Sequence, residues 1–134
     1  MRNIIKKLLL ISSFVMLASY TNAQDSPLGK PKDEIRNSYQ SLIPLIKTLK
    51  SDSCDIFEMP GGIETAFYYK NNICIRTKQT FPLVDSVFLV DELSKRYKKT
   101  GQDKWVTKNG KEEIRFLTDS DEKQCSIVFS EIKK

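Results

Sequence analysis

The residue types that most enzymes use for acid–base and nucleophilic catalysis are sparse in this chain of 134 residues. It contains no histidine, which rules out Ser-His-Asp and Cys-His triads, histidine-containing zinc sites and histidine acid–base catalysis. Its three cysteines, Cys54, Cys74 and Cys125, include no Cys-x-x-Cys pair, and this argues against thiolate metal binding and thioredoxin-like chemistry. We therefore expect no metal site, no cofactor and no enzymatic activity.

Acidic clusters are the one remaining route to hydrolysis. They lie at Asp91-Glu92, Glu112-Glu113 and Asp119 to Glu122. Adjacent residues of a strand point to opposite faces, so Glu112 and Glu113 cannot serve as a facing acid and base, and so small a domain has little material to wall a cleft. The last cluster lacks the glycine and distal glutamate of an EF-hand loop, so it is interpreted as a solvated turn. A carboxylate-based hydrolase is the least favoured function.

The clearest structural signal is the stretch Glu64–Thr77, in which two runs of aromatic and β-branched residues flank Asn71-Asn72. Asparagine tolerates the positive φ of a tight turn, so the pair predicts a two-residue hairpin loop. That loop sends alternate residues to opposite faces of the hairpin. The expected core face consists of Ala66, Tyr68, Ile73 and Ile75, and the other face of Phe67, Tyr69, Cys74 and Arg76.

This second face is too apolar for a plain solvated surface. Tyrosine and arginine are enriched at binding hot spots, so Phe67, Tyr69 and Arg76 form the predicted binding surface. Trp105, on a short strand, is a further amphipathic anchor. The alternative for each aromatic residue is core packing, either under a helix or at one end of the core.

The cysteines also suggest a covalent link. An oxidising compartment permits one disulfide and leaves one thiol over. Cys125 starts the alternation Cys125, Ile127, Phe129 and is expected in the core of a strand, so Cys54 and Cys74 are the predicted pair. Three buried free thiols are the alternative, because cysteine packs as a small hydrophobic residue.

The first 23 residues have the three-part pattern of a secretory signal peptide. Three basic residues precede the apolar run Leu8–Ala18, and cleavage is expected between Ala23 and Gln24. The apolar run is well short of the roughly 20 residues that a membrane span needs. The sequence therefore predicts an exported protein, periplasmic or secreted, with no membrane span in the mature chain.

The charge distribution disfavours nucleic acid as a partner. Residues 1–23 hold three basic residues and no acidic one, so their removal lowers the formal charge from +5 to +2. Basic and acidic residues are interleaved along the rest of the chain, whereas a nucleic-acid interface needs a basic excess on one face.

After the signal peptide, we expect a flexible leader at 24–32 and a single domain at 33–134. Apolar periodicity predicts a first helix from Asp33 to about Lys50, kinked near Ser41 by Pro44, and a second helix over Val84–Lys99. Besides the hairpin, alternation and turn residues predict strands at 54–59, 104–107, 113–118 and 125–132.

The resulting order, α-β-β-β-α-β-β-β, predicts an α+β fold in which an antiparallel sheet of about six strands carries two helices on one face. The halves 33–78 and 84–132 would then form a two-fold αβββ repeat. The leading functional hypothesis is a non-enzymatic domain that binds a protein or another macromolecule with the uncovered sheet face. The alternative is a small-ligand or lipid carrier, with the apolar stretch Phe81–Val90 lining a pocket between helix and sheet.

Overall fold

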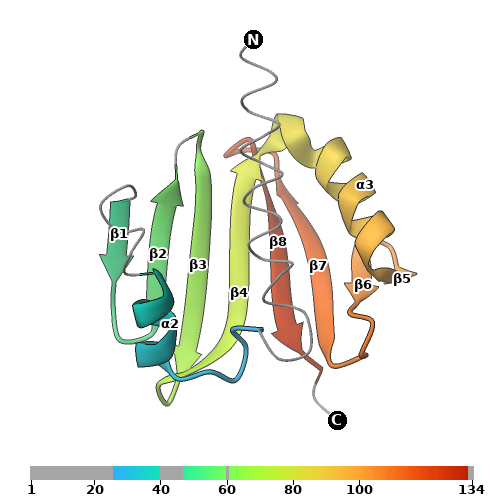
Figure 1. Ribbon diagram of the computed structural model, residues 1–134. Coiled ribbons are helices and arrows are strands. Elements are labelled where there is room, and N and C mark those ends of the chain that lie inside the picture. Colours follow the sequence, from blue (N-terminus) through green and yellow to red (C-terminus); the bar gives the residue numbers. More distant parts are fainter. Residues whose placement is uncertain (1–25, 40–46, 60, 133–134) are drawn as a thin grey trace.

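The computed structural model describes residues 26–39, 47–59 and 61–132. Within these ranges, one antiparallel sheet carries two helices on one face (Figure 1), which confirms the predicted α+β class. The expected signal peptide, its cleavage site at Ala23-Gln24 and the helix kink near Ser41 lie outside the described residues.

Each helix is followed by four strands. The first unit comprises α2 (Lys32–Tyr39), β1 (Lys47–Lys50), β2 (Cys54–Met59), β3 (Ile63–Lys70) and β4 (Ile73–Pro82). A 3-10 turn, η2 (Leu83–Asp85), leads to the second unit, which comprises α3 (Ser86–Arg96), β5 (Lys98–Gly101), β6 (Lys104–Val106), β7 (Glu112–Asp119) and β8 (Gln124–Glu131). The strands follow the order β1-β2-β3-β4-β8-β7-β6-β5 in the described sheet. This order is symmetric about the β4–β8 boundary, so the two units share one topology.

The two edge strands, β1 and β5, are additional to the predicted set. Lys47–Lys50 was expected to be helical but pairs with β2, and Lys98–Gly101 pairs with β6 beyond the end of α3. The backbone turns extended at Tyr97, directly after α3. Both edge strands are rich in lysine, and charged residues on an edge strand discourage pairing with another sheet. In the sequence, the same lysines make these segments look like the solvated ends of helices.

The described part of the leader, residues 26–32, is docked on the sheet, whereas its composition predicted a flexible leader. The Gly29 N–H donates to the Cys74 carbonyl at 2.8 Å, and the Cys74 N–H donates to the Lys30 carbonyl at 2.9 Å. Leu28 is buried in the core, and the Ser26 hydroxyl donates to the Glu112 carboxylate of β7. These contacts hold the leader beside the start of β4.

One ladder of directly opposed residues crosses six strands on the side of the helices. It consists of Asp55, Phe67, Thr77, Phe129, Ile114 and Trp105, all buried. We call this ladder the buried row. Arg36 of α2 bonds to Asp55 at one end of it, and Ser94 of α3 accepts a bond from Trp105 at the other. Both helices therefore cover the same face, as predicted, and anchor at opposite ends of one row.

The next ladder toward the β3–β4 turn lies on the opposite face. It consists of Cys54, Tyr68, Arg76, Ser130, Glu113 and Val106. We call it the open row, and its side of the sheet the open face, because no described helix lies over it (Figure 1). Each member of the open row is the sequence neighbour of a member of the buried row, so every strand contributes to both.

Candidate functional site

The β3–β4 hairpin turns at Asn71-Asn72, as predicted, with positive φ values of 53° and 63°. The register shifts between Tyr68 and Tyr69, so Tyr68 faces Arg76 and not Ile75. Such a β-bulge places one extra residue in one strand and reverses the side of the sheet on which later residues lie. It moves Arg76 to the face that carries Tyr68.

The faces of the hairpin are therefore the reverse of the predicted ones. Phe67 is fully buried and Tyr69 is 6% exposed, whereas Ile73 and Ile75 are 37% and 45% exposed. The prediction that Phe67 and Tyr69 form an exposed binding surface is wrong. Both faces carry apolar residues, so alternation alone could not show which face the helices cover. Of the three hairpin residues, only Arg76 lies at the surface.

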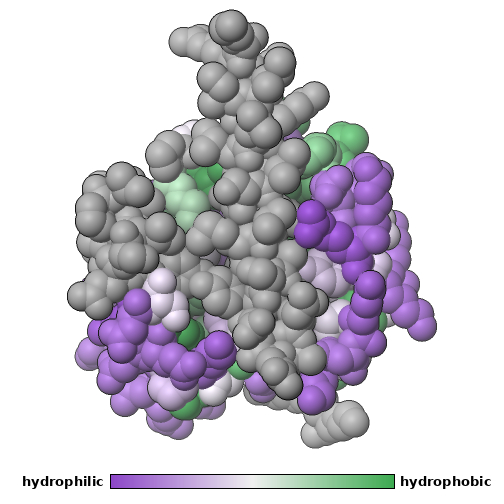
Figure 2. All heavy atoms as spheres, in the orientation of Figure 1, coloured by the Kyte–Doolittle hydropathy of each residue, from purple (hydrophilic) through white to green (hydrophobic). Residues whose placement is uncertain are grey.

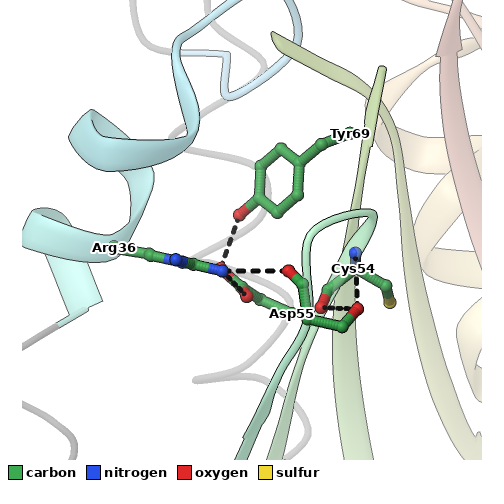
Figure 3. A network of polar contacts seen from close by, with 5 residues as sticks. Arg36, Cys54, Asp55 and Tyr69 are labelled. Atoms are coloured by element: carbon green, nitrogen blue, oxygen red, sulfur yellow. Dashed lines mark hydrogen bonds and ion pairs between the residues drawn. The ribbon is translucent and has the colours of Figure 1, made fainter. Parts of the chain in front are cut away.

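Tyr69 belongs instead to a polar anchor beneath α2 (Figure 3). The Arg36 guanidinium donates to both carboxylate oxygens of Asp55, with Nε–Oδ2 and Nη2–Oδ1 distances of 2.9 and 2.8 Å. The Tyr69 hydroxyl donates to Asp55 Oδ2 at 2.8 Å, and Arg36 Nη2 also donates to the Ser51 carbonyl at 3.0 Å. A fully buried carboxylate is thus satisfied by a bidentate arginine and a phenol, which fixes α2 on the sheet.

The electrostatics of this anchor favour structure over proton transfer. Burial, together with the bond to Asp55, raises the pKa of the Tyr69 phenol far above its ordinary value. The bond to Asp55 likewise raises the pKa of the Arg36 guanidinium. Tyr69 therefore remains a neutral donor and Arg36 a fixed cation.

Trp105 packs in the core. The binding role predicted for it is therefore wrong, and the alternative of core packing is confirmed. Its side chain is fully buried, and its indole Nε1 donates to Ser94 Oγ of α3 at 3.3 Å. The Lys99 ammonium lies 6.0 Å from the ring centroid. Trp105 fixes α3 on the sheet as Asp55 fixes α2.

The predicted Cys54–Cys74 disulfide is absent, since all three cysteines are free. Cys54 lies on the open face and Cys74 on the helix face, with β3 between their strands, and such a pair cannot be bridged without moving the backbone. Figure 3 shows the Cys54 sulfur directed away from the Asp55 carboxylate. Burial raises the pKa of Cys74 to about 12 and of Cys125 to about 11, so both are poor nucleophiles at neutral pH.

The acidic pair Glu112 and Glu113 divides between the two faces, as predicted. Glu113 pairs with Arg115 at 2.7 Å, whereas Glu112 is buried beside the leader. The sequence did not predict that Glu112 faces Glu131 across the sheet. Burial raises the pKa of Glu112, and the bond from Ser26 opposes this rise. The bond from Ser26 to this carboxylate fixes the leader against β7.

The apolar stretch Phe81–Val90 does not line one common surface. Phe81 and Leu89 are buried in the core, while Val84 and Val87 point outward with 79% and 81% of their surface exposed. Across the described ranges, no three His, Cys, Asp or Glu side chains are grouped to hold a metal ion, and no helix is long and apolar enough to cross a membrane.

The open row holds the most distinctive exposed group of the sheet. The Arg76 guanidinium carbon lies 4.4 Å from the centroid of the Tyr68 ring, a cation–π stack on neighbouring strands. Around the stack lie Cys54, Lys78 and Ser130. Tyr68 was missed because its face of the hairpin was predicted to be the core face, and the bulge that brings Arg76 beside it was not predicted.

Comparisons with protein-family models, with curated proteins and with solved structures find no match for this chain.

Proposed function

We propose that the protein is a small exported, non-enzymatic domain that binds a protein partner through the open face of its sheet. The observation that carries this proposal is the Tyr68–Arg76 stack on a sheet face that no described helix covers. Tyrosine and arginine supply much of the binding energy at protein interfaces.

The stack is organised before any partner arrives. Tyr68 is held by pairing with Cys54 on β2 and with Arg76 on β4. An arginine already stacked on a ring loses less rotamer freedom when it binds, and this lowers the entropic cost of association. The guanidinium edge then remains free to donate to carbonyl or carboxylate groups.

The open face is large enough for a specific interface. Its five longer strands, β2, β3, β4, β8 and β7, have between six and ten residues. At about 4.8 Å between strands and 3.3 Å per residue, they form a surface of roughly 24 by 26 Å. This footprint is of the same order as the roughly 800 Å² that each partner contributes to a standard interface.

Charge on this face favours a protein over a nucleic acid. Lys78 is a diagonal neighbour of Glu64 across β3 and β4, and Arg115 pairs with Glu113 on β7. Leu117 adds an exposed apolar side chain. A mixed surface of this kind suits a protein partner, whereas nucleic acid requires a basic excess.

Export is part of the proposal and is supported by the signal-peptide pattern of residues 1–23. In the envelope or outside the cell, the partner would be a protein of the same compartment. All three cysteines are free thiols in this fold, so the proposal requires no disulfide in that compartment.

Affinity capture from envelope extracts tests the proposed surface. Tagged wild-type protein should retain a defined partner. The double variant Tyr68→Ala/Arg76→Ala should retain at least about tenfold less of that partner. The matched control is Val84→Ser/Val87→Ser, which alters exposed side chains outside the open face. Equal capture by the Tyr68/Arg76 variant and the wild type would refute the binding face.

A further inference from the structure

The two ends of the sheet differ in charge, and each end exposes a pair of apolar side chains. At one end β4 leads into η2 and α3, where Val84 and Val87 project into solvent. They are three residues apart, so they lie on the same side of the helix start. Figure 2 shows hydrophobic atoms gathered where α3 begins, beside hydrophilic atoms farther along it.

The surroundings of this valine pair are acidic. The Leu83 N–H donates to the Lys123 carbonyl at 2.9 Å, which places the β7–β8 turn beside η2. That turn carries three exposed acidic residues, Asp119, Asp121 and Glu122, and one exposed lysine, Lys123, so it remains acidic overall. We call the valine pair and these three acids the acidic end.

The opposite end of β4 has the reverse character. Ile73 and Ile75 are exposed there, next to Lys70 at the hairpin turn. The β6–β7 turn lies at the same end of the sheet and adds the exposed residues Lys108 and Lys111. The end of β8 adds one exposed acid, Glu131, so the three lysines leave a net positive charge among these four residues. None of the three lysines has an acidic partner among the described residues. We call the isoleucine pair and these lysines the basic end.

The two ends cannot meet within one molecule. β4 runs from Ile73 to Pro82, and ten extended residues span about 30 Å. One chain thus presents an apolar pair with an acidic rim and, across the length of the sheet, an apolar pair with basic neighbours. The two ends are complementary, because each has an exposed apolar pair and the charges beside the two pairs have opposite signs.

We propose that the protein self-associates end to end, with the acidic end of one copy seated on the basic end of the next. The two surfaces are different, so the contact is heterologous and each copy keeps one free end. Such contacts extend into chains and need not stop at a dimer. Ile75 adjoins Arg76 in β4, so the contact at the basic end borders the Tyr68–Arg76 stack, whereas the contact at the acidic end lies away from it.

Sedimentation velocity over a range of protein concentrations tests this proposal. The wild-type protein should show a mass that increases with concentration at low salt and falls in high salt, because the acidic and basic rims are screened. Val84→Ser/Val87→Ser and Ile73→Ser/Ile75→Ser should each weaken association by about tenfold or more. Circular dichroism should show that both variants remain folded, since they change only exposed side chains.

Mixing the two variants gives the sharpest result. Each variant keeps one intact end, so the mixture should form a heterodimer through these ends and nothing larger. A wild-type protein that stays monomeric at every concentration would overturn the proposal, as would variants that associate like the wild type or a mixture that forms no heterodimer. These outcomes do not depend on the Tyr68–Arg76 stack, so they leave the proposed partner surface to its own test.

Discussion

The buried row and the open row lie one residue apart along every strand they cross, yet their side chains have different roles. Asp55 is fixed by Arg36 and Tyr69, and Trp105 by Ser94, so the two ends of the buried row hold the two helices. In the open row, Tyr68 and Arg76 contact each other and solvent. Residue type does not explain the contrast, because Tyr68 and Tyr69 are the same residue at adjacent positions.

The comparison shows two separate effects: alternation along β3 puts Tyr68 and Tyr69 on opposite faces, and the bulge at Ile75 of β4 brings Arg76 to the face of Tyr68. Without the register shift at Tyr68/Tyr69, Arg76 would lie on the helix side together with Phe67. Each member of the buried row can therefore be compared with its sequence neighbour in the open row. Substituting the buried residue should lower the free energy of unfolding, and substituting its neighbour should not.

The largest difference in the free energy of unfolding is expected between alanine variants of Trp105 and Val106. Truncating the fully buried indole in Trp105→Ala should lower the free energy of unfolding by about 4 kcal/mol, because it leaves a cavity under α3. Val106→Ala, on the open face, should cost less than about 1 kcal/mol. Urea denaturation of both variants measures the contrast, and equal losses would show that the two faces are not distinct.

A somewhat smaller difference is expected at Asp55 and Cys54. Asp55→Ala leaves the Arg36 cation and the Tyr69 hydroxyl without their acceptor, at a cost of about 3 kcal/mol. Cys54→Ala removes a half-buried thiol and should cost less than about 1 kcal/mol. Chemical denaturation gives both values. If Asp55→Ala were as stable as Cys54→Ala, the Arg36–Asp55–Tyr69 anchor would not be what holds α2 on the sheet.

The two tyrosines should differ by about 2 kcal/mol. Tyr69→Phe removes a hydrogen bond to a charged, buried acceptor, and such bonds contribute about 1.5 to 3 kcal/mol. Tyr68→Phe keeps the ring that Arg76 stacks on, so stability should be unchanged within about 0.5 kcal/mol. Thermal and urea unfolding of the two single variants measure this difference, and a larger loss for Tyr68→Phe would reverse the assignment of faces.

The smallest effect concerns the pH dependence at Glu112 and Glu113. Burial raises the pKa of Glu112 above its ordinary value of 4.5, so the folded protein retains this proton to a higher pH than the unfolded chain. Its contribution to stability is complete below pH 4.5 and is lost as the pH rises through the raised pKa. Glu112→Gln should flatten this decline.

Glu113→Gln is the matched control, because Glu113 lies on the open face and pairs with Arg115. Unfolding free energies measured between about pH 4 and pH 8 should decline with pH in the wild type and in Glu113→Gln, but not in Glu112→Gln. An unchanged decline in Glu112→Gln would assign the pH dependence to another group.

Much of the fold follows from local signals in the sequence. The Asn71-Asn72 turn, the strand at Cys54–Met59 and the helix after Val84 were predicted because turn residues and apolar periodicity act over a few residues. The edge strands were missed because their pairing with β2 and β6 depends on distant partners. Lysine-rich segments such as Lys47–Lys50 carry no alternation that marks a strand.

The candidate site was harder to predict, for a physical reason. Both faces of β3 carry aromatic residues, so burial depends on where α2 docks, and α2 docks where Arg36 can reach Asp55. A buried aspartate looks like a surface residue in a sequence. Arg76 lies at the surface as expected, but it stacks on Tyr68, whereas Phe67 and Tyr69 lie on the buried face.

The claim that the open face binds a partner is tested most directly by one measurement, quantitative capture of envelope proteins by matched variants. Tyr68→Ala/Arg76→Ala should lose the partner that the wild type retains, while Val84→Ser/Val87→Ser should keep it. Equal retention by the Tyr68/Arg76 variant and the wild type, or a wild-type protein that captures nothing beyond blank resin, would contradict it.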